Sequence, residues 1–343
     1  MARKTQMNKL TSPELLAHVN PVNKDLKEEF LCYLKAINRS EGTIKQYNND
    51  LDIFFCWVLQ YAKNKEFTKV TKRDIIAYQG WLINQNGNSP ARVRRLKAAI
   101  SSMSNFCENI LADEDPEYAQ FRSIVRKVEN PVNQPVREKT VLTDEDVDSL
   151  LSKLIEKKKY EMACYVALAA YGGRRKAEIC RFKVDDFDDS HLICGGSLYR
   201  SSPIKTKGRG GGKIIPCYTL AKKFKPYFDL WMNERNTRQI ESIWLFPSQT
   251  NPEEHLQLST VNSWMSTISN MTGLDIYAHS FRHYYTTMLS NQGLPDNVIK
   301  EIQGWGDISM VAVYLDRDMS DTLEMYFGEE GIKAQQKKSL EDL

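Results

Sequence analysis

The sequence predicts a mainly α-helical protein that is divided into two domains and carries one small antiparallel sheet. The chain has 343 residues, whereas a typical domain has about 100 to 200. Apolar residues recur at helical spacing on both sides of residues 129–140, which contain two prolines and no such periodicity. One β-prone, glycine-containing stretch, residues 191–220, interrupts the helical pattern of the second half.

The composition excludes several classes of protein. Apolar residues make up 41% of the chain and charged residues 27%, which is usual for globular proteins and unlike disordered, collagen-like or membrane chains. The longest nearly apolar stretch, MACYVALAAYGG from Met162, has about half the length that crosses a bilayer, so it predicts a buried helix. The start lacks the apolar core of a secretion signal, and the seven cysteines form no CxxC pair. We therefore expect a protein of a reducing cytoplasm with no membrane partner.

Four helices are predicted for a first domain of residues 22–128, after an extension of residues 1–21. The first two are indicated by apolar spacing alone. The third begins near Thr71, where TKRD has the pattern of a capping box, and the fourth follows Ser89 and Pro90, an N-cap and a first-turn proline. The apolar positions of the first two helices are Leu26, Phe30, Tyr33, Leu34 and Ile37, and then Ile44, Tyr47, Leu51, Phe54, Phe55 and Val58.

Basic residues are concentrated in two places. Residues 1–140 hold 22 Lys and Arg against 16 Asp and Glu, and residues 190–228 hold eight Lys and Arg and no acid. In the fourth helix, basic residues crowd the first two turns, where they could grip phosphates. An ordinary solvated basic surface would give the same pattern. The proposed contacts there are Arg92, Arg94, Arg95 and Lys97.

The second domain is predicted over residues 141–330, after the linker of residues 129–140. Thr143 is its first N-cap, with acids in the following turn. The basic stretch at 191–220 is expected to form a small sheet or hairpin, with a glycine-rich turn at 208–212 and lysines near the tip. Residues 320–328, SDTLEMYFG, are a candidate for a short amphipathic helix before the charged tail of residues 331–343, which we expect to fray.

No cofactor or metal is predicted. The segment GRGGGKI resembles a phosphate-binding loop in composition but lacks the GxxxxGK[ST] order. His279 and His283 have a metal-ligand spacing, but no acid lies between them and no third ligand is indicated nearby.

The segment AHSFRHYYTTMLSN carries a candidate site. His279 and Arg282 fall opposite an apolar helical face, so the imidazole and the guanidinium are predicted to project together. By itself an H-x-x-R pair is weak support, since a chance pair on a solvated face is common. The apolar face consists of Phe281, Tyr284, Tyr285, Met288 and Leu289.

The residues around this pair extend the pattern. Trp305 lies 26 residues after His279, and Tyr314 lies nine residues after Trp305. Upstream, YGGRRKAEI places Arg175 three residues before Glu178. In this order and spacing the chain resembles the tyrosine recombinase, or phage integrase, family, whose motifs are an Arg with an acid three residues later, H-x-x-R, Gly-His or Gly-Trp, and a Tyr about nine residues further on. The resemblance covers about residues 20 to 330.

The resemblance implies roles for individual residues. Two guanidiniums, Arg175 and Arg282, would neutralise the scissile phosphate, and Tyr314 would attack it to form a 3′-phosphotyrosine. His279 would bond the phosphate or handle the tyrosine proton. Trp305 stands where many members have His, so its indole can donate a hydrogen bond but cannot exchange a proton.

A lysine of the hairpin is implied as the acid that protonates the leaving oxygen. Lys205 fits a K-T form of the motif and Lys207 a K-G form, and we prefer Lys205. The alternative is that both lysines, with Arg209, only line the DNA backbone. Glu178 is expected to orient the site, and Arg174 to contact a phosphate or lie on the surface.

The implied fold is a SAM-like core-binding domain followed by an α+β catalytic domain, which together clamp a DNA duplex. The implied function is site-specific recombination of double-stranded attachment sites for a mobile element or prophage, without a cofactor or metal. We expect a monomer or dimer before synapsis and a homotetramer in the synaptic complex, with the segment after Tyr314 packing on a neighbour and an accessory directionality factor as a further partner. The alternatives are a type IB topoisomerase-like enzyme and a non-catalytic DNA-binding relative.

Overall fold

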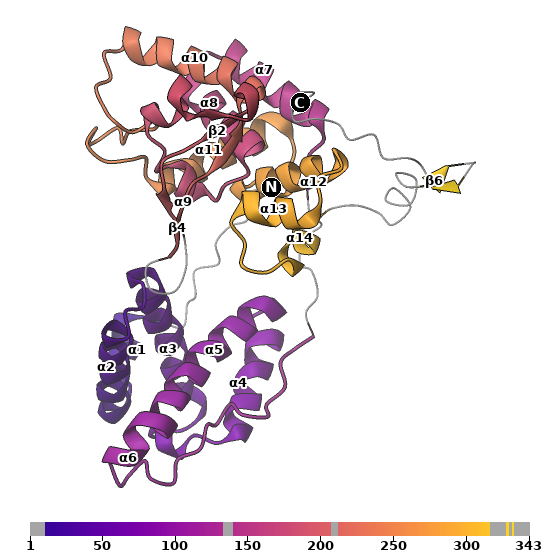
Figure 1. Cartoon of the computed structure of the whole chain (residues 1–343). Helices are drawn as coiled ribbons and strands as arrows, with labels where there is room; N and C mark the ends of the chain where they lie inside the picture. Colours follow the sequence, from indigo (N-terminus) through magenta and orange to yellow (C-terminus); the bar gives the residue numbers. More distant parts are fainter. Residues whose placement is uncertain (1–10, 133–139, 207–211, 316–326, 329–330, 333–343) are drawn as a thin grey trace. The chain divides into compact units, whose positions relative to one another are not determined.

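A computed structural model of the protein describes residues 11–132, 140–206, 212–315, 327–328 and 331–332. These residues form two compact units, one on each side of residues 133–139 (Figure 1). Lys207, Arg209 and residues 320–326 of the expected terminal helix lie outside the described residues.

The first unit is helical and contains the four helices that the apolar spacing predicts. A short additional helix lies within the expected extension of residues 1–21, because the Ser12 side chain accepts from the Leu15 amide and Pro13 occupies the first turn. The elements are α1 (Pro13–His18), α2 (Pro21–Ala36), α3 (Glu41–Tyr61), the 3₁₀ turn η1 (Phe67–Lys69), α4 (Lys72–Asn84), α5 (Pro90–Phe106), the π turn η2 (Cys107–Leu111) and α6 (Ala112–Glu114).

The predicted starts of α4 and α5 are confirmed. Thr71 and Asp74 form a reciprocal capping box at α4, and Ser89 caps α5 with Pro90 in its first turn. The apolar faces meet in one core, where Phe30 and Phe54 are fully buried. The polar face of α5 is therefore held at a fixed orientation on this unit.

The second unit contains the remaining helices and the small sheets (Figure 1). Its helices are α7 (Asp144–Glu156), α8 (Tyr160–Gly172), α9 (Lys176–Ile179), α10 (Ala221–Thr237), α11 (Leu258–Thr272), α12 (Ala278–Asn291), α13 (Asp296–Gln303) and α14 (Ser309–Tyr314). Its strands are β1 (Leu192–Ile193), β2 (Leu198–Arg200), β3 (Ile204–Lys205), β4 (Ile214–Ile215), β5 (Tyr218–Leu220), β6 (Phe327–Gly328) and β7 (Gly331–Ile332), with 3₁₀ turns η3 (Val184–Phe187), η4 (Asp189–His191) and η5 (Cys194–Gly196).

Helix α8 lies at the centre of this unit. It is buried from Met162 to its end and packs against α7, α10 and α12, which confirms the buried helix predicted from its apolar composition. The helix ends at Gly173, whose φ of 61° lies in the left-handed region that glycine adopts without strain. The chain then turns at once into Arg174, Arg175 and α9.

The basic stretch forms two antiparallel sheets. Strands β1, β2 and β5 make one sheet in that order, with Tyr199 opposite Thr219. Strands β3 and β4 make a second, two-stranded sheet, in which Lys205 pairs with Ile214. The predicted hairpin is thus present as β3 and β4, and Lys205 lies at its last described residue pair.

The structure differs from the expected helix of residues 320–328 at the two residues of it that are described. Phe327 and Gly328 form β6, which pairs antiparallel with β7, and Gly328 lies opposite Gly331. Glycine disfavours a helix interior and tolerates a tight hairpin, which explains the difference. In the ranges described, no helix combines the length and the apolar character needed to cross a membrane.

We expect Gly173→Ala to destabilise the second unit by roughly 2 to 4 kcal/mol, because the new side chain would adopt a strained left-handed backbone and displace a packed ring. A Cβ at this position would lie 2.2 Å from Cδ1 of Tyr285. The free energy of unfolding in urea measures the loss. Gly306→Ala is the control, since nothing lies within 4 Å of its Cβ position, and equal stability of the two variants would contradict the prediction.

Candidate active site

Helix α12 supplies the two side chains of the H-x-x-R motif. Arg282 is completely buried, Thr286 is as well, and His283 is 9% exposed. The side of α12 opposite its apolar face is therefore covered by protein. Burial of a guanidinium is costly unless hydrogen bonds compensate it, so the partners of Arg282 determine the architecture of the site.

Two helix ends hold the Arg282 guanidinium. Its Nη1 donates to the carbonyl of Gly173 at 2.9 Å, and its Nη2 donates to the carbonyl of Gln303 at 3.3 Å. These carbonyls lie at the carboxyl ends of α8 and α13, where main-chain carbonyls lack helical partners and carry partial negative charge. Both ends close on a left-handed glycine, Gly173 or Gly304.

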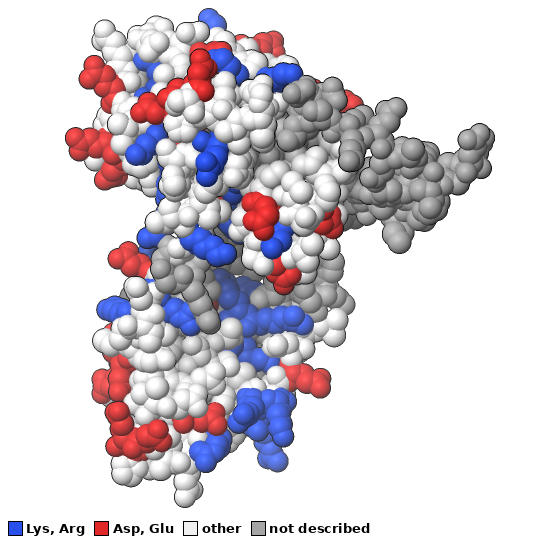
Figure 2. Space-filling view, in the orientation of Figure 1, with Lys and Arg blue, Asp and Glu red and all other residues white. Residues whose placement is uncertain are grey.

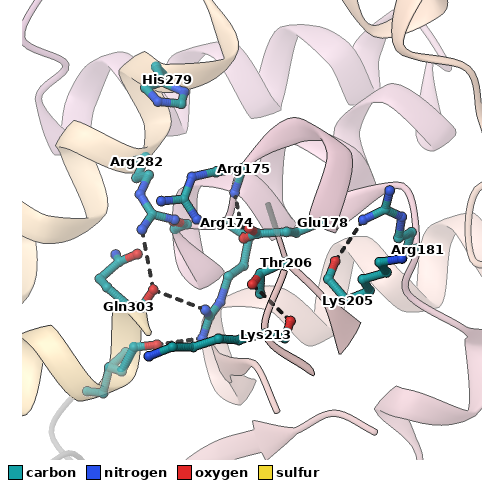
Figure 3. Close-up of polar contacts among 12 residues, drawn as sticks. Arg174, Arg175, Glu178, Arg181, Lys205, Thr206, Lys213, His279, Arg282 and Gln303 are labelled. Atoms are coloured by element: carbon teal, nitrogen blue, oxygen red, sulfur yellow. Dashed lines mark hydrogen bonds and ion pairs between the residues drawn. The ribbon is translucent and has the colours of Figure 1, made fainter. Parts of the chain in front are cut away.

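Glu178 holds Arg175 at the start of α9. Its carboxylate accepts from the Arg175 backbone amide at 3.2 Å and from Nη1 of the Arg175 side chain at 3.0 Å. The Glu178 side chain is 1% exposed, whereas that of Arg175 is 29% exposed. Arg175 is thus oriented by a buried carboxylate, as Figure 3 shows, and part of its side chain remains exposed.

Tyr314 is the last residue of α14 and is buried with its ring between other site residues. The ring stacks on Trp305 with centroids 5.0 Å apart, and the Arg282 guanidinium carbon lies 5.5 Å from the Tyr314 centroid. The Tyr314 hydroxyl is 3.3 Å from Nε2 of His279. The structure therefore brings together three residues of the expected motifs around the candidate nucleophile.

Burial and neighbouring positive charges lower the pKa values of His279 and Arg282. Burial, then the charges of Arg282, His283 and Arg175, lower the pKa of His279 to about 4, so its imidazole is neutral at physiological pH. Burial and the charge of Arg175 lower the pKa of Arg282 to about 10, which leaves this guanidinium charged. A neutral imidazole beside the Tyr314 hydroxyl can accept its proton.

Three buried donors in and beside the site have no hydrogen-bond acceptor among the described residues. They are Nε of Arg174, Nε of Arg282 and the indole Nε1 of Trp305. A buried donor left without an acceptor costs about 1 to 3 kcal/mol. Such groups in one place indicate that an anion or another acceptor completes the site.

The lysines of the hairpin are described in part. Lys205 is exposed on β3, and its carbonyl accepts from Nη1 of Arg181 at 2.7 Å (Figure 3). Lys207 and Arg209 lie outside the described residues. Across the hairpin, the carbonyl of Lys213, the residue before β4, accepts hydrogen bonds from the Thr206 amide and hydroxyl.

Sequence reasoning missed the groups that hold the guanidiniums. The acceptors from Gly173 and Gln303 are backbone carbonyls, and residue type does not identify such atoms. The double glycine at the end of the apolar stretch indicates that α8 ends there, and it was the sequence signal for the free carbonyl of Gly173. Arg174, expected on a phosphate or at the surface, is instead 1% exposed and donates to the carbonyls of Ile302 and Gln303.

The basic residues of α5 are placed differently from one another. Nη2 of Arg95 is 2.9 Å from the buried carboxylate of Asp50, and Nε of Arg94 donates to the Pro131 carbonyl. Nζ of Lys97 is directed into the unit, where it donates to the carbonyls of residues 128 and 129. The expected phosphate contact of Lys97 therefore does not fit its buried position, and burial lowers its pKa.

Among the residues that the structure describes, no three or more His, Cys, Asp or Glu side chains are grouped so that they could hold a metal ion.

Two family models match the chain. The model of the phage integrase family matches residues 140–321, which is more than half of the chain. The model of the phage integrase N-terminal SAM-like domain matches residues 26–117.

Relatives with similar sequences are recombinases by name. The SPbeta prophage-derived recombinase-like protein YomM of Bacillus subtilis is 29% identical over 315 residues, which cover 90% of this chain and 88% of that protein. The tyrosine recombinase XerA of Pyrococcus horikoshii is 26% identical over 299 residues, 85% of this chain and 89% of that protein.

Solved structures share the fold. XerH recombinase bound to a palindromic difH substrate superposes with a TM-score of 0.65 at 18% identity, over 88% of this chain and 83% of that chain. A lambda integrase dimer bound to a COC′ core site superposes with a TM-score of 0.60 at 13% identity, over 89% of this chain and 81% of that chain.

We expect the His279 ring of the DNA-free protein to stay neutral at about pH 5.5, since its pKa is lowered to about 4. The unfolded chain binds this proton below about pH 6.5, so His279 destabilises the folded state as the pH falls from there towards the folded pKa. An NMR titration of the imidazole, with His279→Gln to assign the signal, measures the midpoint. A midpoint near about 6.5 would contradict the prediction.

Proposed function

The chain belongs to the phage integrase family and is a tyrosine recombinase, and we propose that Tyr314 is the nucleophile that cleaves DNA at a phosphate bound by Arg175, His279 and Arg282. The observation that carries this assignment is the Tyr314 hydroxyl, 3.3 Å from the His279 imidazole, on a ring that lies against the buried Arg282 guanidinium. A tyrosine with only a packing role would not need a neutral base at its hydroxyl.

The proposed reaction exchanges one phosphate ester for another. The Tyr314 oxygen forms a bond to phosphorus while the bond to the 5′ oxygen breaks, which leaves a 3′-phosphotyrosine and a free 5′ hydroxyl. The phenol proton passes to His279, and the leaving oxygen takes a proton from a lysine. Religation reverses these steps with a 5′ hydroxyl from another strand, so the ester energy is retained and no ATP is required.

The polar groups of the site suit a phosphate in this reaction. Arg282 and Trp305 each have a buried donor without an acceptor among the residues described, and Arg175 presents a partly exposed guanidinium. Non-bridging oxygens that gain negative charge in the transition state would accept from these donors. Because Arg282 is fixed by two carbonyls before DNA binds, little reorganisation is needed.

His279 and Trp305 take separate parts in this scheme. The lowered pKa of His279 leaves Nε2 free to accept the Tyr314 proton near neutral pH. A bound phosphate would then stabilise the imidazolium that results. The Trp305 indole contributes a hydrogen-bond donor and the surface on which the Tyr314 ring stacks.

We assign the general acid to Lys205, with Lys207 as the alternative. Lys205 is exposed on β3, and Arg181 fixes its backbone through the 2.7 Å hydrogen bond to its carbonyl. Lys207 and Arg209 remain proposed DNA contacts of the segment between β3 and β4. Glu178 is assigned to orienting Arg175.

The first unit is proposed to bind the duplex through α5. Figure 2 shows Lys and Arg side chains gathered over the part of this unit where Figure 1 places α4 and α5. We assign phosphate contacts to Arg92, Arg94 and Arg95 and leave Lys97 out, since its ammonium is used inside the unit. Residues 22–128 and 141–330 would then bind the duplex as the two parts of a clamp. XerH bound to a difH substrate and a lambda integrase dimer bound to a COC′ core site support DNA as the partner.

The biological setting is also a proposal. YomM is named as prophage-derived, which supports integration or excision of a prophage or mobile element. We propose a homotetramer on two sites, assembled from monomers or dimers, with an accessory factor that sets direction. All seven cysteines are unpaired, which agrees with the reducing bacterial cytoplasm as its location.

Tyr314→Phe is expected to abolish covalent DNA adducts while preserving DNA affinity, because phenylalanine keeps the ring packing and removes the nucleophile. The assay incubates protein with a nicked suicide substrate in EDTA and separates adducts on a denaturing gel. Tyr160→Phe, at the start of α8, is the matched control. An adduct formed by Tyr314→Phe would refute the assignment, and supercoil relaxation without strand exchange would favour the topoisomerase-like alternative.

Replacing the general acid is expected to slow cleavage of the normal substrate about 100-fold or more. The same substitution should leave the cleavage rate unchanged on a substrate whose leaving 5′ oxygen is replaced by sulfur. A thiol ionises at about pH 8.5, so it leaves without a proton donor. The single-turnover cleavage rates of Lys205→Met and Lys207→Met are compared on both substrates. Rescue of Lys207→Met alone would move the role to Lys207, and rescue of neither would exclude both.

A further inference from the structure

Arg174 precedes the proposed catalytic Arg175 and is the second buried guanidinium of this region. It is 1% exposed, so it cannot be the surface residue that its sequence position suggests. Two of its three nitrogens have protein acceptors, since Nη1 and Nη2 donate to the carbonyls of Gln303 and Ile302 at 3.3 and 2.5 Å. Its Nε has no acceptor among the described residues.

These two carbonyls form the carboxyl end of α13. The helix ends at Gln303 and closes on left-handed Gly304, so its last carbonyls lack helical partners and lie at the negative end of the helix dipole. Arg174 therefore caps α13 from a position far away in the sequence. Trp305 follows directly after Gly304, and its amide donates to the Lys300 carbonyl at 3.0 Å, so its backbone is attached to the end of α13 that Arg174 caps.

Arg174 and Arg282 meet at one atom. Both donate to the Gln303 carbonyl, each at 3.3 Å, and Figure 3 shows this carbonyl between the two guanidiniums. Each arginine also donates to a second carbonyl. For Arg174 it is the carbonyl of Ile302, and for Arg282 it is the carbonyl of Gly173. Loss of Arg174 would therefore leave the end of α13 held by one guanidinium instead of two, and the Ile302 carbonyl would lose the donor that Arg174 supplies.

The packing around Gly304 shows how closely this end is held. A Cβ at Gly304 would lie 2.3 Å from Cδ1 of Ile215 on β4 and 3.7 Å from Nη1 of Arg174. The α13 end is thus enclosed by β4 and the Arg174 side chain. A shift of this end would move Trp305, on which the Tyr314 ring stacks.

We infer that Arg174 is a positioning residue that makes no contact with DNA. Through its hydrogen bonds to the carbonyls of Ile302 and Gln303, it keeps Trp305 aligned with Arg175 and Tyr314. This inference rests on the proposed roles of Trp305 and Tyr314. It assigns to adjacent arginines different tasks: Arg175 faces the phosphate, and Arg174 aligns the opposite wall of the site.

The test is a double-mutant cycle between Arg174 and Trp305, measured as the single-turnover rate of adduct formation on saturating suicide substrate. We expect Arg174→Met to slow cleavage about 10- to 100-fold, as a small misplacement of a reacting group does. In the Trp305→Phe background the same substitution should cost less than about threefold, because the donor that Arg174 aligns is already absent. Arg174→Lys should fall between, since an ammonium lacks the planar fork.

Three further measurements separate this inference from its alternatives. The DNA affinity of Arg174→Met and its dependence on salt should match wild type, whereas a lost phosphate contact would reduce the salt slope by about one. Arg238→Met is the control for the loss of one positive charge, since Arg238 is a half-exposed residue that pairs with Glu234 at 3.9 Å. Thermal unfolding identifies a variant that does not fold, in which case Arg174→Lys carries the cycle.

The inference is overturned if Arg174→Met cleaves at the wild-type rate, if its salt slope falls by about one, or if its effect is undiminished in the Trp305→Phe background. The last outcome would mean that Arg174 acts independently of Trp305. Failure of the proposed function has a different signature, an adduct that persists in Tyr314→Phe.

Discussion

The structure of the second unit depends on the burial of one guanidinium. Arg282 is inaccessible to solvent, and a buried charge without compensation would destabilise the fold by several kcal/mol, on the order of 3 to 5. The Gly173 and Gln303 carbonyls provide the compensation. They belong to the ends of α8 and α13, so the buried charge fixes the relative position of three helices. A residue of the proposed active site thus also holds the helices of this unit together.

The burial of Arg282 also explains why Gly173, Gly304 and Arg174 lie beside it. Each helix can present its last carbonyls to a guanidinium only if the chain turns away sharply, and Gly173 and Gly304 make that turn with positive φ. Arg174 donates to the Ile302 carbonyl, which Arg282 does not reach, and shares the Gln303 carbonyl with Arg282. The two arginines repel each other, and their shared acceptor at Gln303 reduces the cost of placing them together. Arg175 remains as the guanidinium with an accessible part.

The arrangement of the site also accounts for the surroundings of Tyr314, the proposed nucleophile. The Tyr314 ring lies against Trp305 and the Arg282 guanidinium, and its hydroxyl meets a neutral imidazole. The positive charges that surround His279, together with its burial, keep that imidazole unprotonated. A phosphate would reverse this balance by adding negative charge, so DNA binding and proton acceptance are coupled through the same electrostatic field.

The sequence alone determined the helical character of both units, the starts of α4 and α5, the central buried α8, the hairpin and the motif residues His279, Arg282, Trp305 and Tyr314. Apolar periodicity, caps and motif spacing are local properties, and they can be read from side-chain types. Tertiary structure alone decided where the basic side chains lie: Arg95 pairs with Asp50, Lys97 is turned inward and Arg174 is buried. It also decided the acceptors of the guanidiniums, because these are backbone carbonyls, present in every residue and brought together across 109 and 129 positions of the chain.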